Sequence, residues 1–181
     1  MPDQQSIPPG EPLSPGCAYA VVDIDGVLAD VRHRLRHVER RPKDWEAFFA
    51  AAAADPPLAE GIAVARRLAA EHEVVYLSGR PERLRTTTER WLARHDVPPG
   101  RLLLRRDGDH RPARQLKLGV VRRIAATAHV AVVVDDDPEV CDALEVAGFT
   151  VFRAAWAPVD KTDDTHLERA LRDAQERDGR T

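Results

Sequence analysis

Five short apolar runs recur along the chain, and the stretches between them carry apolar residues at helical spacing. Each run is about five residues long and rich in valine and leucine, as in strands buried on both faces. The runs predict strands over residues 18–23, 73–77, 101–105, 130–134 and 149–153. Apolar positions three and four apart predict helices over residues 59–71, 82–95, 112–127 and 138–147. This alternation predicts an α/β fold, with a Rossmann-like parallel sheet and helices on both faces.

Two carboxylates follow the first predicted strand. Asp23 and Asp25 stand one residue apart, just before Gly26, which predicts a turn. Ligands of open α/β sheets bind at the carboxyl ends of the strands. Neighbouring carboxylates repel each other when both are ionised, and a hard cation such as Mg²⁺ relieves that repulsion. The motif therefore indicates phosphoryl transfer with a metal ion, and a solvated acidic turn is the alternative.

Further polar groups follow later strands or begin a helix. They are Ser78, Gly79 and Arg80 after the second predicted strand, Lys117 near the start of a helix, and Asp135 and Asp136 after the strand 130–134. A lysine ammonium is a compact cation that can meet a phosphate. Acidic pairs that end two strands strengthen the case for a metal and phosphate site.

In this order, the motifs resemble the four motifs of the haloacid dehalogenase (HAD) superfamily of phosphohydrolases, and they span residues 20–137. The resemblance implies that Asp23 is a nucleophile that forms an aspartyl-phosphate, and that Asp25 is the general acid and base. It also implies that Ser78 and a backbone amide bind the phosphoryl oxygens. Lys117 would offset the negative charge of Asp23 and the phosphate.

The same resemblance implies Mg²⁺ as the cofactor. The expected ligands are Asp23, the backbone carbonyl of Asp25 and a carboxylate of the fourth motif. Asp136 is the expected direct ligand, with Asp135 in support.

A narrower resemblance lies between the motifs. Residues 104–111, residues 88–92 and the position of Arg34 are similar to the phosphatase domain of bifunctional polynucleotide kinase/phosphatases. That family removes 3′-phosphates from nucleic-acid ends, so the resemblance implies an end-healing activity. One position departs from the family pattern, because Ala113 stands four residues before Lys117 where an acidic residue is expected.

Basic residues gather around the predicted site, although the formal net charge of the chain is −3. Residues 78–123 contain thirteen Lys or Arg and five Asp or Glu, and residues 32–41 contain five Arg and one Glu. Arginine suits phosphate because its planar fork donates two parallel hydrogen bonds. Any nucleic-acid contact should be directed at the backbone. The expected substrate-binding residues are Gly26, Arg34, Gly79, Arg80, Arg106, Asp109 and Arg111.

A small helical insertion, about residues 30–58, is predicted after the first strand. It contains Trp45, Phe48 and Phe49. Core packing is the favoured interpretation of these aromatic residues, and a stacking platform for a terminal base is the alternative. An insertion of this size is expected to leave the site open to a polymer end.

The outer segments and the composition complete the prediction. Residues 1–17 are rich in proline and predicted to be a disordered tail, residues 18–157 the phosphatase domain, and residues 158–181 a charged helix or tail. No membrane span or signal is recognised, so a cytoplasmic protein is expected. The sequence given has no P-loop, so a separate kinase or ligase partner is possible. Oligomeric state is not predicted.

Three functions are compatible with the sequence. A 3′-phosphatase acting on DNA or RNA ends is the favoured one. A phosphatase of mononucleotides or other small phosphate esters needs only the four motifs, and Ala113 keeps it open. A non-catalytic protein that binds nucleic-acid ends is less favoured, because a pure binder gains nothing from carboxylates crowded beside a phosphate.

Overall fold

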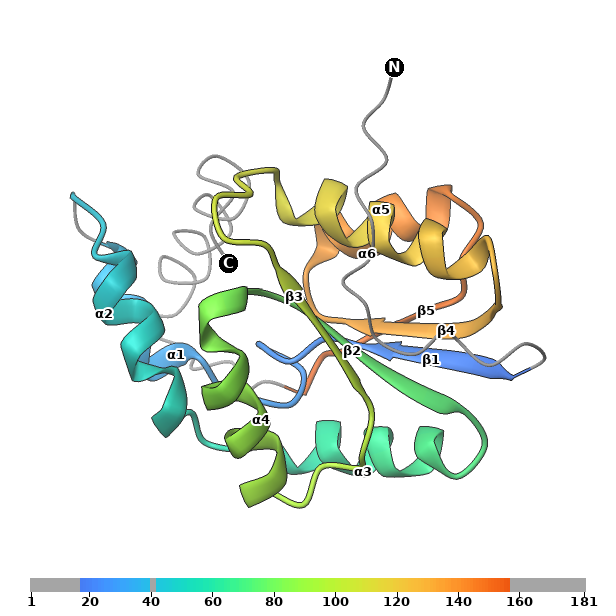
Figure 1. The fold of residues 1–181 in the computed structure, drawn as a ribbon, viewed down its shortest axis with the longest axis horizontal. Coiled ribbons are helices and arrows are strands. Elements are labelled where there is room, and N and C mark those ends of the chain that lie inside the picture. The colour runs from blue at the N-terminus through green and yellow to red at the C-terminus, as the bar shows by residue number, and fades with distance from the viewer. Residues whose placement is uncertain (1–16, 40–41, 157–181) are drawn as a thin grey trace.

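The computed structural model describes residues 17–39 and 42–156, in which five strands form one parallel sheet (Figure 1). The strand order is β3-β2-β1-β4-β5. The strands are β1 (Ala18–Val22), β2 (Glu73–Pro81), β3 (Arg101–Arg105), β4 (His129–Asp135) and β5 (Val151–Arg153). The predicted α/β fold class is confirmed. The predicted N-terminal tail, apart from Cys17, and the predicted segment 158–181 lie outside the described residues.

Helices cover both faces of the sheet (Figure 1). Two of them, α3 (Ala59–Ala69) and α4 (Arg85–Arg94), pack on one face, while α5 (Ala113–Ala125) and α6 (Pro138–Val146) pack on the other. Neighbouring β1 residues point to opposite faces. Val22 therefore packs in the core beneath α3 and α4, and Val21 packs in the core beneath α5 and α6. Among the described residues, the helices are too short or too polar to cross a bilayer.

Three short helical elements lie between β1 and α3. They are α1 (Arg32–Glu39), α2 (Trp45–Ala50) and the 3₁₀ helix Ala51–Ala54. Their apolar residues form a third core, to which Trp45, Phe48 and Phe49 contribute packed rings. Core packing, the favoured interpretation of these aromatic residues, is confirmed.

Strand β2 is longer than the apolar pattern predicts. The pattern ends the strand at residue 77, but the structure continues it to Pro81. Ser78 pairs with Leu104 of β3 and Pro81 pairs with the next residue, Arg105, so Gly79 and Arg80 are additional residues on the β2 side. This bulge bends the strand where it meets the predicted site, a common place for bulges.

Candidate active site

The loops after β1 and β4 meet at one edge of the sheet. Asp23 follows β1 directly, and its backbone N–H donates to the carbonyl of Val134 in β4 at 2.9 Å. Gly26 in the first loop has φ +81°, and a Cβ there would lie 2.0 Å from a carboxylate oxygen of Asp136. Glycine therefore serves twice at this position, because it allows both the turn and the close approach of the two acidic loops.

Lys117 of α5 lies between the carboxylates of these loops. Its Nζ is 2.8 Å from Asp23 Oδ2 and 2.7 Å from Asp135 Oδ2. Lys117, Asp23 and Asp135 are buried, whereas Asp136 beside them is exposed. These four residues, named the Lys117 cluster below, bring together the first, third and fourth motifs.

The Lys117 cluster contains one cation and three carboxyl groups. Burial alone would lower the pKa of Lys117, but Asp135 and Asp23 raise it well above its usual value, so the amine is charged. Burial raises the pKa of Asp23 to about 8, with Asp135 and Asp25 adding to the rise and Lys117 partly offsetting it. The cluster is therefore short of positive charge.

The carboxylates of this cluster fit a divalent cation. One ligand oxygen from each of Asp23, Asp135 and Asp136 lies within 4.8 Å of the others. Asp23 Oδ1 is buried and has no hydrogen-bond partner among the described residues. An all-oxygen donor set is what Mg²⁺ prefers, and a divalent cation would supply the missing charge.

A second cluster of charges lies beside the first, formed by Arg34, Arg80, Asp25 and Asp55. Asp25 Oδ1 accepts from Arg34 Nη2 at 2.8 Å and from Arg80 Nη2 at 2.6 Å. Asp55 accepts from Nε of Arg34 at 2.9 Å and from Nη2 of Arg80 at 2.7 Å. Both arginines are fully buried. Two guanidinium groups thus face two carboxylates, and this Arg34–Arg80 cluster is balanced in charge.

The balance sets the state of Asp25. Burial alone would raise the pKa of its carboxyl, but Arg80 and Arg34 more than offset it and lower the pKa to about 2. Asp25 is therefore an ionised acceptor held in place by two arginines. Direct contact of Arg34 or Arg80 with substrate stays a prediction. Their Nε and Nη2 atoms donate to the two carboxylates, and Nη1 of each is buried without a partner among the described residues.

Asp55 is the residue of this cluster that the sequence analysis missed. Its side chain is fully buried and also contacts His33 Nε2 at 2.8 Å, while its backbone carbonyl accepts from Trp91 Nε1 at 2.8 Å. In the sequence it is one acid between an alanine run and Pro56. Only the folded insertion brings it to Arg34 and Arg80.

The Ser78-Gly79-Arg80 segment is braced from β3. Ser78 is buried, and its Oγ accepts from the backbone N–H of Arg80 at 3.2 Å. The Arg105 side chain donates to the carbonyls of Gly79 at 3.2 Å and Arg111 at 2.7 Å. Arg105 therefore holds the bulge of β2 against the loop that precedes α5.

The remaining predicted substrate residues lie on that loop. Asp109 accepts from Arg111 Nε at 3.0 Å and Nη2 at 2.6 Å, so these two side chains pair with each other. Arg106 is exposed. A substrate contact by any of the three stays a prediction.

Ala113, the departure from the family pattern, is the first residue of α5 and is buried. Lys117 lies one helical turn further on and is held by Asp23 and Asp135. The lysine is thus positioned without an acidic residue at 113.

Comparison with protein families gives a match over most of the chain. The family model described as "Polynucleotide kinase PNKP phosphatase domain" matches residues 17–157. No curated protein sequence matches the chain significantly.

Solved structures show the same fold. Two structures of a Pnkp1/Rnl/Hen1 complex, one of them an RNA repair complex, match with TM-scores of 0.64 and 0.65 at 22% and 23% identity. Each match covers 79% of this chain and 44% or 47% of the other, so the chain spans less than half of those proteins. The HAD-hydrolase YfnB from Bacillus subtilis, bound to magnesium, matches with a TM-score of 0.52 at 10% identity, over 75% of this chain and 87% of that one.

Proposed function

Because the chain belongs to the polynucleotide kinase phosphatase-domain family of HAD hydrolases, we propose that it removes 3′-phosphates from DNA or RNA ends with Mg²⁺ as cofactor. The family makes the protein a phosphatase. The observation that supports this activity best is the Lys117 cluster, in which one buried ammonium bridges two carboxylates at 2.7 and 2.8 Å beside a third. Arginines on the loop before α5 suit a polyanionic substrate.

In the proposed reaction, an Asp23 oxygen attacks phosphorus and the bond from phosphorus to the 3′-oxygen breaks. The electron pair goes to the leaving oxygen, which takes up a proton to become the 3′-hydroxyl. Water then attacks the aspartyl-phosphate, releasing inorganic phosphate and restoring Asp23. Lys117 favours the ionised form of Asp23, partly offsetting the effect of burial that raises its pKa to about 8, and offsets the charge of the approaching phosphate.

Asp25 is assigned the proton transfers. As a carboxylate fixed by Arg34 and Arg80, it is suited to take a proton from the attacking water. To protonate the leaving oxygen, the same carboxyl must carry a proton, which the two arginines oppose.

Asp23, Asp135 and Asp136 would hold Mg²⁺, with the carbonyl of Asp25 as the expected further ligand. When bound, the ion would neutralise charge on the phosphoryl oxygens. Ser78 would donate its hydroxyl hydrogen to one of these oxygens, because its Oγ already accepts from Arg80.

A second candidate is a phosphatase of mononucleotides or other small esters. Ala113 favours it, because the narrower family has an acidic residue there.

A separate kinase or ligase partner and a cytoplasmic location remain proposals. The Pnkp1 structures are of a complex of that protein with Rnl and Hen1.

Phosphate release from three substrates would separate these functions. We would compare an oligonucleotide with a 3′-phosphate, the same oligonucleotide with a 5′-phosphate, and a nucleoside 3′-monophosphate, all with Mg²⁺ and with Asp23→Asn as the control. Selective release from the 3′-phosphorylated oligonucleotide is expected. Faster turnover of the mononucleotide would replace the proposal with a nucleotidase. If the protein released phosphate from none of the three substrates, both candidate functions would be contradicted.

A further inference from the structure

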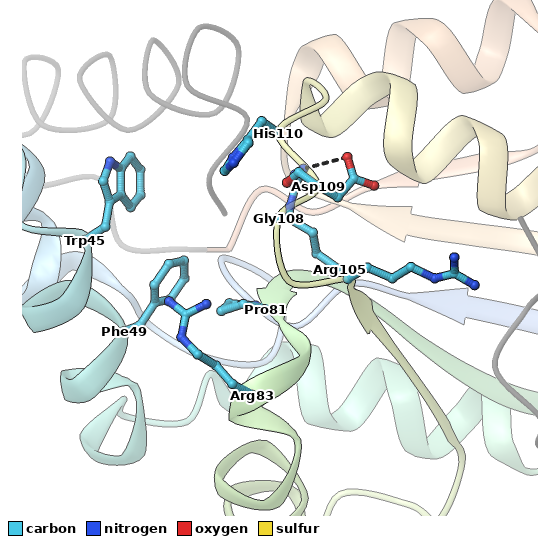
Figure 2. A pocket seen from close by; sticks show the side chains of 9 residues that line it. Trp45, Phe49, Pro81, Arg83, Arg105, Gly108, Asp109 and His110 are labelled. Carbon is cyan, nitrogen blue, oxygen red and sulfur yellow. Dashed lines mark hydrogen bonds and ion pairs between the residues drawn. The ribbon is translucent and has the colours of Figure 1, made fainter.

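A pocket of about 140 Å³ lies between the insertion and the loop before α5 (Figure 2). Trp45 and Phe49 of α2 line one side, and Gly108 and His110 line the other. Pockets that hold drug-sized ligands are about 300–1,000 Å³, so this one suits a single group of a larger ligand.

The lining favours a planar, electron-rich group. Trp45 and Phe49 belong to the insertion core, where they are 8% and 5% exposed, and both also line the pocket. The Arg83 guanidinium lies over the Phe49 ring, with its carbon 5.4 Å from the ring centre. Aromatic rings and flat guanidinium groups stack on nucleobases, and such stacking tolerates any base.

The charge of the lining disfavours a cationic occupant. Arg83, Arg105 and Arg106 line the pocket. Of the two acidic residues beside them, Asp109 is paired with Arg111 and Asp107 with Arg83 at 3.2 Å. An organic cation would therefore meet net positive charge, which repels it, whereas a neutral base would not be repelled.

The pocket adjoins the catalytic residues. Pro81 in its wall directly follows the Ser78-Gly79-Arg80 segment. On the other side, the Arg34 guanidinium that holds Asp25 packs 4.2 Å from the centre of the Phe48 ring, which contacts Trp45 and Phe49 edge-on. A group attached to the reacting phosphate would thus find the pocket next to the site.

We propose that this pocket binds the nucleobase of the terminal nucleotide, the one that bears the 3′-phosphate. The assignment rests on the proposed function. It adds a contact that requires a base on the terminal nucleotide but accepts any of the bases. A phosphodiester of the same strand is the competing occupant, because arginines also bind phosphate.

Two 3′-phosphorylated oligonucleotides that differ only in the terminal nucleotide test the assignment, one with a normal base and one abasic. We expect kcat/KM for the abasic strand to be lower by about tenfold or more, the scale of base–aromatic stacking. Equal kcat/KM values would overturn the base pocket and leave the 3′-phosphatase intact.

A binding measurement makes the two proposals separable. The affinity of both strands for Asp23→Asn, followed by tryptophan fluorescence, reports on the pocket without turnover. Tighter binding of the strand with the base supports the pocket. If the wild-type protein nevertheless released no phosphate from either strand, only the proposed function would be contradicted. Equal affinities overturn the pocket.

Variants locate the effect. His110→Ala alters an exposed pocket residue, and Trp45→Leu removes the indole while keeping an apolar side chain in the insertion core. Both should reduce the ratio of base to abasic kcat/KM toward one. The matched control is His129→Ala, at the far end of β4 from Asp135, which should keep the wild-type ratio. An unchanged ratio in His110→Ala and in folded Trp45→Leu would overturn the assignment.

Discussion

The two charge clusters at the active site are neighbours, yet they differ in balance. The Lys117 cluster sets one cation against three carboxyl groups, and Asp23 Oδ1 has no partner among the described residues. The Arg34–Arg80 cluster sets two guanidinium groups against two carboxylates that each accept from both. Incomplete compensation leaves the first able to bind a cation and a phosphoryl group. Equal numbers of opposite charges make the second a support that fixes Asp25, although Nη1 of each arginine is buried without a hydrogen-bond partner among the described residues.

Replacing the nucleophile should have the largest effect on activity. Asp23→Asn removes the attacking carboxylate and keeps its shape, so turnover should fall by about 10⁴-fold or more. Because it also removes one of three crowded carboxyl groups, the melting temperature should be unchanged or higher. A phosphate-release assay measures the turnover, and thermal unfolding measures the melting temperature. Substantial remaining activity would contradict the covalent route.

Breaking the balanced cluster should affect stability most. Asp55→Asn leaves two buried guanidinium groups with one carboxylate, and breaking a buried ion pair typically costs about 3–5 kcal/mol. We expect a loss of that order in the free energy of unfolding, measured by urea denaturation, together with lower kcat because Asp25 loses its support.

The control for this variant is Asp142→Asn. Asp142 pairs with Arg153 on the surface, where its side chain is 68% exposed, and an exposed pair contributes at most about 1 kcal/mol. If Asp55→Asn were no more destabilising than Asp142→Asn, the Arg34–Arg80 cluster would not be a support for Asp25.

Mg²⁺ should stabilise the protein through the Lys117 cluster alone. At a concentration one hundred times its Kd, a ligand that binds only the folded state adds about 2.7 kcal/mol. The melting temperature should therefore rise with Mg²⁺ and fall again with a chelator. Asp136→Asn should remove most of this shift. A full shift in Asp136→Asn would place the ion elsewhere.

The sequence was sufficient to predict the Lys117 cluster. Asp23 and Asp135 end apolar runs, and parallel strands bring their carboxyl ends to one edge, so their convergence follows from the fold class. Lys117 was placed there by resemblance, and its two short contacts agree.

The Arg34–Arg80 cluster was only partly predictable. The sequence indicates both arginines as substrate ligands, which stays a prediction, but sequence spacing does not show that the insertion places Asp55 against them. The bulge in β2 was missed for a related reason. It depends on the register between β2 and β3, whereas the apolar pattern reports only which residues are buried.

An acid placed at residue 113, where this sequence departs from the family pattern, should have the smallest effect on activity. Ala113→Asp adds a carboxylate to the first turn of α5, where the helix dipole favours it, although the position is buried. Since Lys117 is already held at 2.8 and 2.7 Å by Asp23 and Asp135, phosphate release should stay within about tenfold of wild type. Ala125→Asp, exposed at the other end of the helix, is the matched control for added charge. The contrary result is a rate of phosphate release from one substrate class that rises much more than tenfold in Ala113→Asp and not in Ala125→Asp. That result would show that residue 113 selects the substrate. It would also show that the four residues of the Lys117 cluster do not set its charge by themselves.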